Sequence, residues 1–147
     1  MEKEKAIKKL SERWPNAEAL RKEFSGLSAL LSGEFARDSG EDKFMVYGIP
    51  YTSDGLVVSR PLNQGLIKNP TVGLIAPGQY HFDTGENIET MTVLEGELYA
   101  KVNGDTGSIF SMLVKYGSIM APAGTELKLE VQQNSPVFYL CQYKPKK

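Results

Sequence analysis

The sequence predicts a mainly β domain, a sandwich or barrel, with a helical extension at its N-terminus. From residue 44 onward, short runs rich in β-branched and aromatic residues alternate with turn signals made of Gly, Pro and Asn. Short strands punctuated in this way are typical of antiparallel sandwiches and barrels rather than of alternating strands and helices. The first 43 residues instead place apolar side chains at helical spacing and hold about half of the chain's charged residues. We therefore divide the chain into a helical extension, residues 1–43, and a β domain, residues 44–147.

The extension is expected to form two short amphipathic helices. Ile7, Leu10 and Trp14 recur at helical spacing, and so do apolar residues within 20–31, with Pro15 separating the two patterns. An apolar stripe of this kind is usually buried within its own fold, so we expect it to pack on the β domain or across a dimer interface. A docking surface for another protein is the alternative.

The whole-chain composition limits the classes of partner. The chain has 147 residues, a size typical of one domain with its own core. A net charge of -1 argues against bulk affinity for nucleic acid or for an anionic membrane. The single Cys141 excludes an intrachain disulfide and a multi-cysteine metal site. The N-terminus lacks the apolar run of a signal peptide and no segment reaches transmembrane length, so we expect a cytoplasmic protein.

Two stretches are expected to pair within one closed β structure, residues 73–96 and residues 116–143. In the second stretch, residues 128–131 (KLEV) and 137–143 (VFYLCQY) suggest antiparallel strands with one buried face each. No P-loop, dinucleotide-binding or serine-hydrolase motif is present. Sheet edges left unpaired favour association into a homodimer.

A small cluster of ionisable residues lies in the first stretch. Residues two apart on a strand point the same way, so His81 and Asp83 share one face, and Glu89 shares another with Met91 and Val93. If both faces look into a barrel, His81 and Glu89 meet across it. Such a pair could bind a metal, act as acid and base, or hold a polar ligand. Met91 and Val93 are expected in the core.

This stretch resembles the first motif of the cupin superfamily, which runs Gly, His-x-His, Glu, six residues, Gly. His81-x-Asp83 stands at the His-x-His position, and Glu89 is followed by six residues and Gly96. The resemblance implies a single-domain cupin jelly-roll barrel.

The second cupin motif, Gly, Pro-x-Gly, two residues, His, is only partly present. Gly117, Pro122 and Gly124 are in place, but Leu127 occupies the His position. The superfamily's metal site normally uses three His and one Glu, whereas this chain has one His in total. We therefore expect no bound metal and no cofactor, and keep a metal site of His81, Asp83 and Glu89 as a less favoured alternative.

A closer resemblance extends over residues 55–143. The chain resembles the pyrimidine/purine nucleoside phosphorylase family in Val72-Gly73-Leu74-Ile75 through Gly78, Tyr80 and Phe82, in Glu89-Thr90-Met91-Thr92-Val93 with Gly96 and Leu98, and in Tyr139-Leu140-Cys141-Gln142-Tyr143. It departs from the family in having Asn69 beside Lys68 where an Arg often precedes the first run, and in its N-terminal residues.

The resemblance implies phosphorolysis of nucleosides of broad base range, giving a free base and a pentose 1-phosphate without a metal. Nucleoside and phosphate would be the partners. Glu89 is the expected catalytic residue, because it could bind ribose hydroxyls or balance an oxocarbenium-like charge. The substrate-binding candidates are His81, Tyr80, Thr92, Tyr139, Tyr143 and Lys68. The cationic candidates for phosphate also include Arg60, Lys101, Lys115 and Lys128. Cys141 is expected to be a small buried hydrophobe. The alternative function is a non-enzymatic cupin that binds a sugar-like or nucleoside-like ligand.

Overall fold

The computed structural model describes residues 3–14, 19, 22, 45–47, 56–61, 71–103, 110–132 and 135–145. The elements are α1 (Lys3–Arg13), β1 (Met45–Tyr47), β2 (Val57–Pro61), β3 (Thr71–Ile75), β4 (Gly78–Asp83), β5 (Asn87–Glu95), β6 (Leu98–Asn103), β7 (Ser111–Leu113), β8 (Ser118–Ala121), β9 (Glu126–Val131) and β10 (Val137–Pro145). The prediction of a mainly β chain with an N-terminal helix is confirmed. No helix of these residues is long and apolar enough to span a membrane.

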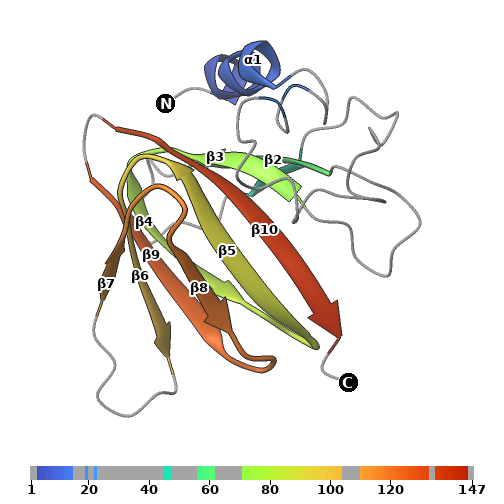
Figure 1. Ribbon diagram of the computed structural model, residues 1–147, viewed down its shortest axis with the longest axis vertical. Coiled ribbons are helices and arrows are strands. Elements are labelled where there is room, and N and C mark those ends of the chain that lie inside the picture. The colour runs from blue at the N-terminus through green and yellow to red at the C-terminus, as the bar shows by residue number, and fades with distance from the viewer. Residues whose placement is uncertain are drawn as a thin grey trace.

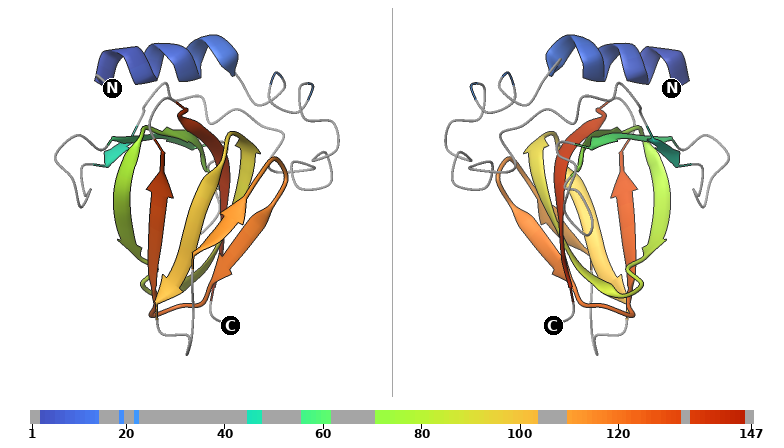
Figure 2. Two further views of the ribbon diagram at one scale, coloured as in Figure 1. Left: turned by 90° about the vertical axis from the view of Figure 1, so that its left-hand side faces the viewer. Right: turned by 90° about the vertical axis from the view of Figure 1, so that its right-hand side faces the viewer.

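The strands form two antiparallel sheets that face each other (Figures 1 and 2). The six-stranded sheet has the order β1-β2-β3-β10-β5-β8, and the four-stranded sheet has the order β4-β9-β6-β7. The two stretches expected to pair do so, because β10 lies between β3 and β5 while β8 pairs with β5 and β9 with β4.

The main core lies between the two sheets. In the four-stranded sheet, every second side chain points into this core. In β9, Leu127, Leu129 and Val131 are buried while the residues between them are half-buried. From the six-stranded sheet, Val93 of β5 and Val137 of β10 join the same cluster. Burial of this one face of each sheet is the arrangement expected of a sandwich or barrel.

One expectation was wrong for β10. Its first five residues are all buried, as are all five residues of β3, so neither β3 nor this part of β10 has a solvated face. The physical reason is α1, which covers the outer face of the six-stranded sheet. Leu10 and Trp14 pack there with Phe138 and Leu140 of β10, and Trp14 meets Phe138 edge-on with ring centroids 5.1 Å apart.

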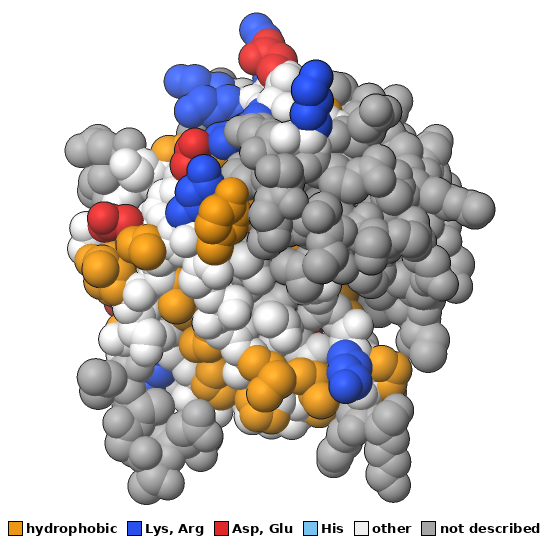
Figure 3. Space-filling view, viewed as in Figure 1, with side chains coloured by type: hydrophobic (Ala, Val, Ile, Leu, Met, Phe, Trp, Pro, Cys, Tyr) orange, Lys and Arg blue, Asp and Glu red, His pale blue; other side chains and the backbone are white. Residues whose placement is uncertain are grey.

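The helix α1 is thus part of the fold. Its apolar stripe packs on the β domain, as predicted, and its Lys and Arg side chains gather on the outside of the molecule (Figure 3). Arg13 connects the end of the helix to the β domain. Its Nη1 and Nη2 donate hydrogen bonds to the Glu95 carboxylate at 2.6 and 3.0 Å, and its guanidinium carbon lies 4.5 Å from the centroid of the Phe138 ring. The second predicted helix, in 20–31, and the domain boundary at 43/44 lie outside the described residues and stay predictions.

Candidate functional site

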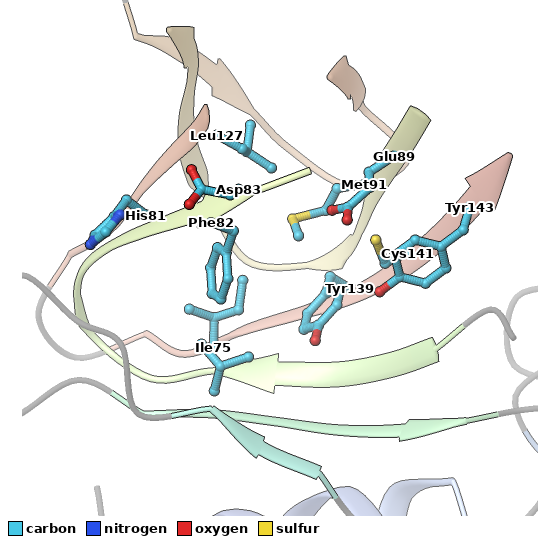
Figure 4. A pocket seen from close by; sticks show the side chains of 11 residues that line it. Ile75, His81, Phe82, Asp83, Glu89, Met91, Leu127, Tyr139, Cys141 and Tyr143 are labelled. Carbon is cyan, nitrogen blue, oxygen red and sulfur yellow. The ribbon is translucent and has the colours of Figure 1, made fainter. Parts of the chain in front are cut away.

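A pocket of about 310 Å³ opens between the two sheets. The residues that line it are Val57, Ile75, His81, Phe82, Asp83, Glu89, Met91, Leu127, Tyr139, Cys141 and Tyr143. Figure 4 shows Tyr139, Cys141 and Tyr143 along β10 on one side, with Phe82 and Leu127 on the other. The volume is at the lower end of the range for small-molecule sites, and an apolar wall with a few polar groups is typical of them.

The register between β5 and β10 brings the polar groups of this wall together. Glu89 lies directly opposite Tyr143, and Met91 lies directly opposite Cys141. Directly opposed residues in an antiparallel pair point to the same face. Glu89, Met91, Cys141 and Tyr143 therefore form one patch on the inner face of the six-stranded sheet, which confirms that Glu89 and Met91 share a face looking inward.

The phenol of Tyr143 is held in its neutral form. Burial raises the pKa of Tyr143 above its ordinary value of 10.0, the neighbouring Cys141 raises it further, and a hydrogen bond with Thr71 opposes the shift. A neutral phenol can both donate and accept a hydrogen bond. The Tyr143 hydroxyl therefore stays protonated at physiological pH, and its hydrogen bond with Thr71 places it toward β3, on the other side of β10 from Glu89.

His81 does not meet Glu89. Tyr80 and Phe82 take the inner face of β4, so alternation turns His81 outward, where its Nδ1 lies 3.3 Å from Glu126 Oε2. Figure 4 shows the imidazole at the edge of the pocket, pointing away from Glu89. The alternation of β4 was predictable from its residues, but which of its two faces packs against the core was not.

Two further substrate-binding candidates lie outside the pocket walls. Tyr80 is fully buried on the inner face of β4, where its hydroxyl donates to the carbonyl of Ala76 and accepts from the amide of Leu56 at 2.9 Å. Burial raises the pKa of Tyr80, and the hydrogen bond with Leu56 opposes the rise. Thr92 lies between the inward-facing Met91 and Val93, so its side chain takes the opposite face of the sheet. From the predicted set, Glu89, Tyr139 and Tyr143 line the six-stranded-sheet side of the pocket, and His81 lines its edge.

No Lys or Arg is among the pocket-lining residues of the described part of the chain. Lys128 lies 3.9 Å from Glu126 on the outer face of the four-stranded sheet, Lys101 lies over Phe110, and Lys115 lies over Tyr116. Lys68 and the side chain of Arg60 lie outside the described residues.

The metal-ligand set of the cupin superfamily does not fit these residues. Within the described ranges, no three His, Cys, Asp or Glu side chains are grouped so that they could hold a metal ion. Leu127 lines the pocket at the position of the second-motif His, and His81 faces Glu126 instead of Glu89.

Several pocket residues were not found by sequence reasoning. Cys141 was expected in the core, and it is buried, but it also lines the pocket beside Tyr143. Phe82 and Ile75 supply apolar wall from β4 and β3. Their strands were predictable, whereas the strand register that places them around Glu89 was not.

The segment that forms the pocket is similar to a known protein family. A family model described as pyrimidine/purine nucleoside phosphorylase matches residues 51–143, which include every residue that lines the pocket. A protein of that name from Leptospira interrogans is 34% identical over 90 residues, 61% of this chain and 80% of the relative. Another from Magnetococcus marinus is 40% identical over 73 residues, 50% of this chain and 73% of the relative.

Solved structures agree on the fold. A protein of unknown function from Vibrio parahaemolyticus superposes with a TM-score of 0.52 at 27% identity, over 67% of this chain and 96% of that one. A cupin domain of an XRE family transcriptional regulator from Enterobacter cloacae gives 0.52 at 16% identity, over 62% and 98%. The two-sheet barrel is therefore a cupin fold, as predicted. Because the family model matches residues 51–143, more than half of the chain, the chain belongs to the pyrimidine/purine nucleoside phosphorylase family.

Proposed function

We propose that this protein catalyses the phosphorolysis of nucleosides, in which the bond from sugar to base is broken and phosphate takes the place of the base. The observation that carries the proposal is the pocket itself. Two carboxylates line it, Asp83 from β4 and Glu89 from β5, and Glu89 lies next to the strand that carries the phenols Tyr139 and Tyr143; the pocket lies wholly within the segment matched by the family model. The relatives' name supplies the substrate class.

Glu89 is suited to the reacting sugar. As the bond to the base breaks, positive charge develops on the ring carbon and oxygen, and a fixed carboxylate stabilises that charge more than it stabilises the neutral nucleoside. The same oxygens can accept hydrogen bonds from ribose hydroxyls. Tyr143, directly opposite on β10, can donate to the sugar. We assign Glu89 the catalytic role and Tyr143 a substrate-binding role.

The base is proposed to lie against the apolar and aromatic wall. Tyr139, Phe82 and Ile75 line this part of the pocket. Stacking on an aromatic face tolerates any base, because every base has a π face. That tolerance supports action on both pyrimidine and purine nucleosides.

Phosphate is most often bound with the help of a Lys or Arg, and the described pocket walls include neither. We propose that Lys68 supplies the cation, because it lies three residues before Thr71, whose side chain hydrogen-bonds with the pocket-lining Tyr143. A single ammonium group binds phosphate as a point charge. This role distinguishes Lys68 from Lys101 and Lys128, which are placed on the outer face of the four-stranded sheet.

The test is phosphate-dependent release of base. Purified protein is incubated with uridine, adenosine or inosine, with and without phosphate, and free base and pentose 1-phosphate are measured by chromatography. Both products are expected only when phosphate is present. Absence of release with all three nucleosides would contradict the proposal. Lys68→Ala is expected to raise the KM for phosphate at unchanged KM for nucleoside, with Lys128→Ala as the control.

A second candidate function is binding without catalysis. The specific observation in its favour is the lack of Lys and Arg in the described pocket walls. In this case the barrel would hold a sugar-like or nucleoside-like ligand and leave it intact. Calorimetric binding of a nucleoside with no products after prolonged incubation with phosphate would select this alternative.

We further propose a cytoplasmic homodimer. The large exposed hydrophobic residues of the described chain are Phe110, Met112, Val114, Tyr116 and Met120. Phe110 directly precedes β7 and the other four lie on or between β7 and β8, which are the edge strands of their sheets. An edge with unpaired backbone groups and apolar side chains is suited to pairing with a second copy of itself. The single buried thiol of Cys141 is compatible with a reducing compartment.

A further inference from the structure

One buried hydroxyl next to the pocket has no hydrogen-bond partner. Ser59 of β2 is 1% exposed, and its Oγ is the buried side-chain polar atom of the described residues that lacks a partner. An unsatisfied buried hydroxyl costs free energy, and most buried polar groups in folded proteins are paired. In a protein with a ligand pocket, the missing partner can come from the ligand.

Ser59 faces the same side of the sheet as the pocket. It lies two residues after Val57 on β2, and Val57 lines the pocket, so strand alternation puts both side chains on the inner face. Ser59 is directly opposite Gly73 of β3, and Gly73 is directly opposite Tyr139 of β10. The three residues thus form one row across the inner face of three neighbouring strands.

Gly73 lets Tyr139 lie across this row. A Cβ atom on residue 73 would stand 2.7 Å from both Cε1 and Oη of Tyr139, closer than real contacts allow. The phenol therefore occupies the space over Gly73, and its hydroxyl points toward the β2 side of the row. Opposed Cβ positions on neighbouring strands are about 5 Å apart, so Ser59 lies about that far from the Cβ position of Gly73, which the Tyr139 hydroxyl occupies. The edge of one ligand can therefore contact Ser59 Oγ and Tyr139 Oη together.

We propose that Ser59 and Tyr139 form a two-hydroxyl subsite that binds the polar edge of the nucleoside base. The proposal rests on the proposed substrate class. Bases present either a carbonyl acceptor or an amino donor on this edge, and a hydroxyl can rotate to donate or to accept. Two rotatable hydroxyls therefore bind both kinds of edge, which suits a family named for pyrimidine and purine nucleosides alike.

The test compares Ser59→Ala with the wild type by calorimetric titration without phosphate. The nucleosides are inosine with a carbonyl at position 6, adenosine with an amino group there, and purine riboside with only hydrogen. Loss of one hydrogen bond is expected to raise the Kd for inosine and for adenosine about 3-fold to 10-fold. The Kd for purine riboside is expected to stay within about twofold. Ser118→Ala, the same change on the exposed β8, is the control.

Thermal unfolding of the unliganded variant gives a second readout. Because Ser59 Oγ has no partner, Ser59→Ala is expected to keep or raise the Tm, while binding weakens. An unchanged Kd for inosine and adenosine, an equal loss for purine riboside, or a clearly lowered Tm would overturn the subsite.

Failure of the subsite and failure of phosphorolysis give different results. Wild-type protein that binds nucleosides through Ser59 but releases no base with phosphate supports the subsite and contradicts the enzyme. Wild-type protein that releases base with no dependence on Ser59 contradicts the subsite alone. Wild-type protein that binds none of the three nucleosides contradicts both.

Discussion

Glu89 of β5 and Tyr143 of β10 lie directly opposite each other, and both side chains line the pocket between the two sheets. The pair sets a carboxylate beside a buried phenol whose pKa is raised, so the phenol remains a neutral donor. This arrangement needs two strands that are more than 40 residues apart in the chain.

Replacing Glu89 by Gln keeps the shape of the side chain and removes its charge. If the carboxylate stabilises positive charge on the sugar, kcat is expected to fall by about 100-fold or more, with a smaller change in KM. The measurement is the steady-state rate of base release at saturating phosphate. Glu86→Gln, in the exposed turn before β5, is the matched control and should keep the wild-type rate. A Glu89→Gln enzyme with normal turnover would mean that Glu89 is structural.

Tyr143 should make the fold sensitive to alkaline pH. Its pKa is raised in the folded protein, first by burial, whereas in the unfolded chain the phenol ionises near its ordinary value of 10.0. Above that pH the unfolded chain releases a proton that the folded chain retains, so the stability contributed below pH 10 is lost as the pH rises. The Tm of the wild type is expected to fall more between about pH 9 and 11 than the Tm of Tyr143→Phe. Parallel Tm curves for the two proteins would contradict this account.

Arg13 is expected to raise the free energy of unfolding by an amount that depends on pH. Arg13→Ala removes two hydrogen bonds to Glu95 and the contact with the Phe138 ring. We expect the free energy of unfolding in urea at pH 7 to fall by about 1–2 kcal/mol. Lys5→Ala changes an exposed residue of the same helix and should lower the free energy of unfolding by less.

The acid dependence follows from the pKa of Glu95. The hydrogen bond from Arg13 lowers that pKa below its ordinary value of 4.5, and partial burial opposes the shift. Stability from a carboxylate with a lowered pKa is present above the ordinary value and is lost as the pH falls through the folded value. The difference between wild type and Arg13→Ala is therefore expected to be smaller at pH 3 than at pH 7. A difference that stays constant would assign the whole effect to the ring contact.

The proposed dimer is tested at its most exposed apolar side chain. Met120 of β8 is 61% exposed, and Met120→Lys places a charge on the sheet edge. The wild type is expected to have twice the mass of one chain by light scattering after gel filtration, and the variant to have the mass of one chain at the same concentration. Gln132→Lys, exposed at the far end of β9, is the control. A monomeric wild type would contradict the dimer, and a dimeric Met120→Lys would place the interface elsewhere.

Local patterns predicted most of the fold because they depend only on neighbours in the chain. The strands, the helix that ends near Trp14, and the inward alternation of Glu89 and Met91 all follow from spacing and are present in the structure. For β4, alternation predicted correctly that His81 and Asp83 share a side. It could not predict that Tyr80 and Phe82 would be the pair that packs in the core between the sheets.

The sequence by itself determined a mainly β chain, its strands, and the family whose motifs surround Glu89. Only the tertiary structure decided which residues share the pocket, because strand order and register are set by contacts between distant segments. In the tertiary structure His81 lies next to Glu126, and the hydroxyl of the buried Tyr80 is hydrogen-bonded to backbone groups. The same packing places Tyr143 opposite Glu89. The row from Ser59 to Tyr139 likewise exists only once β2, β3 and β10 are adjacent.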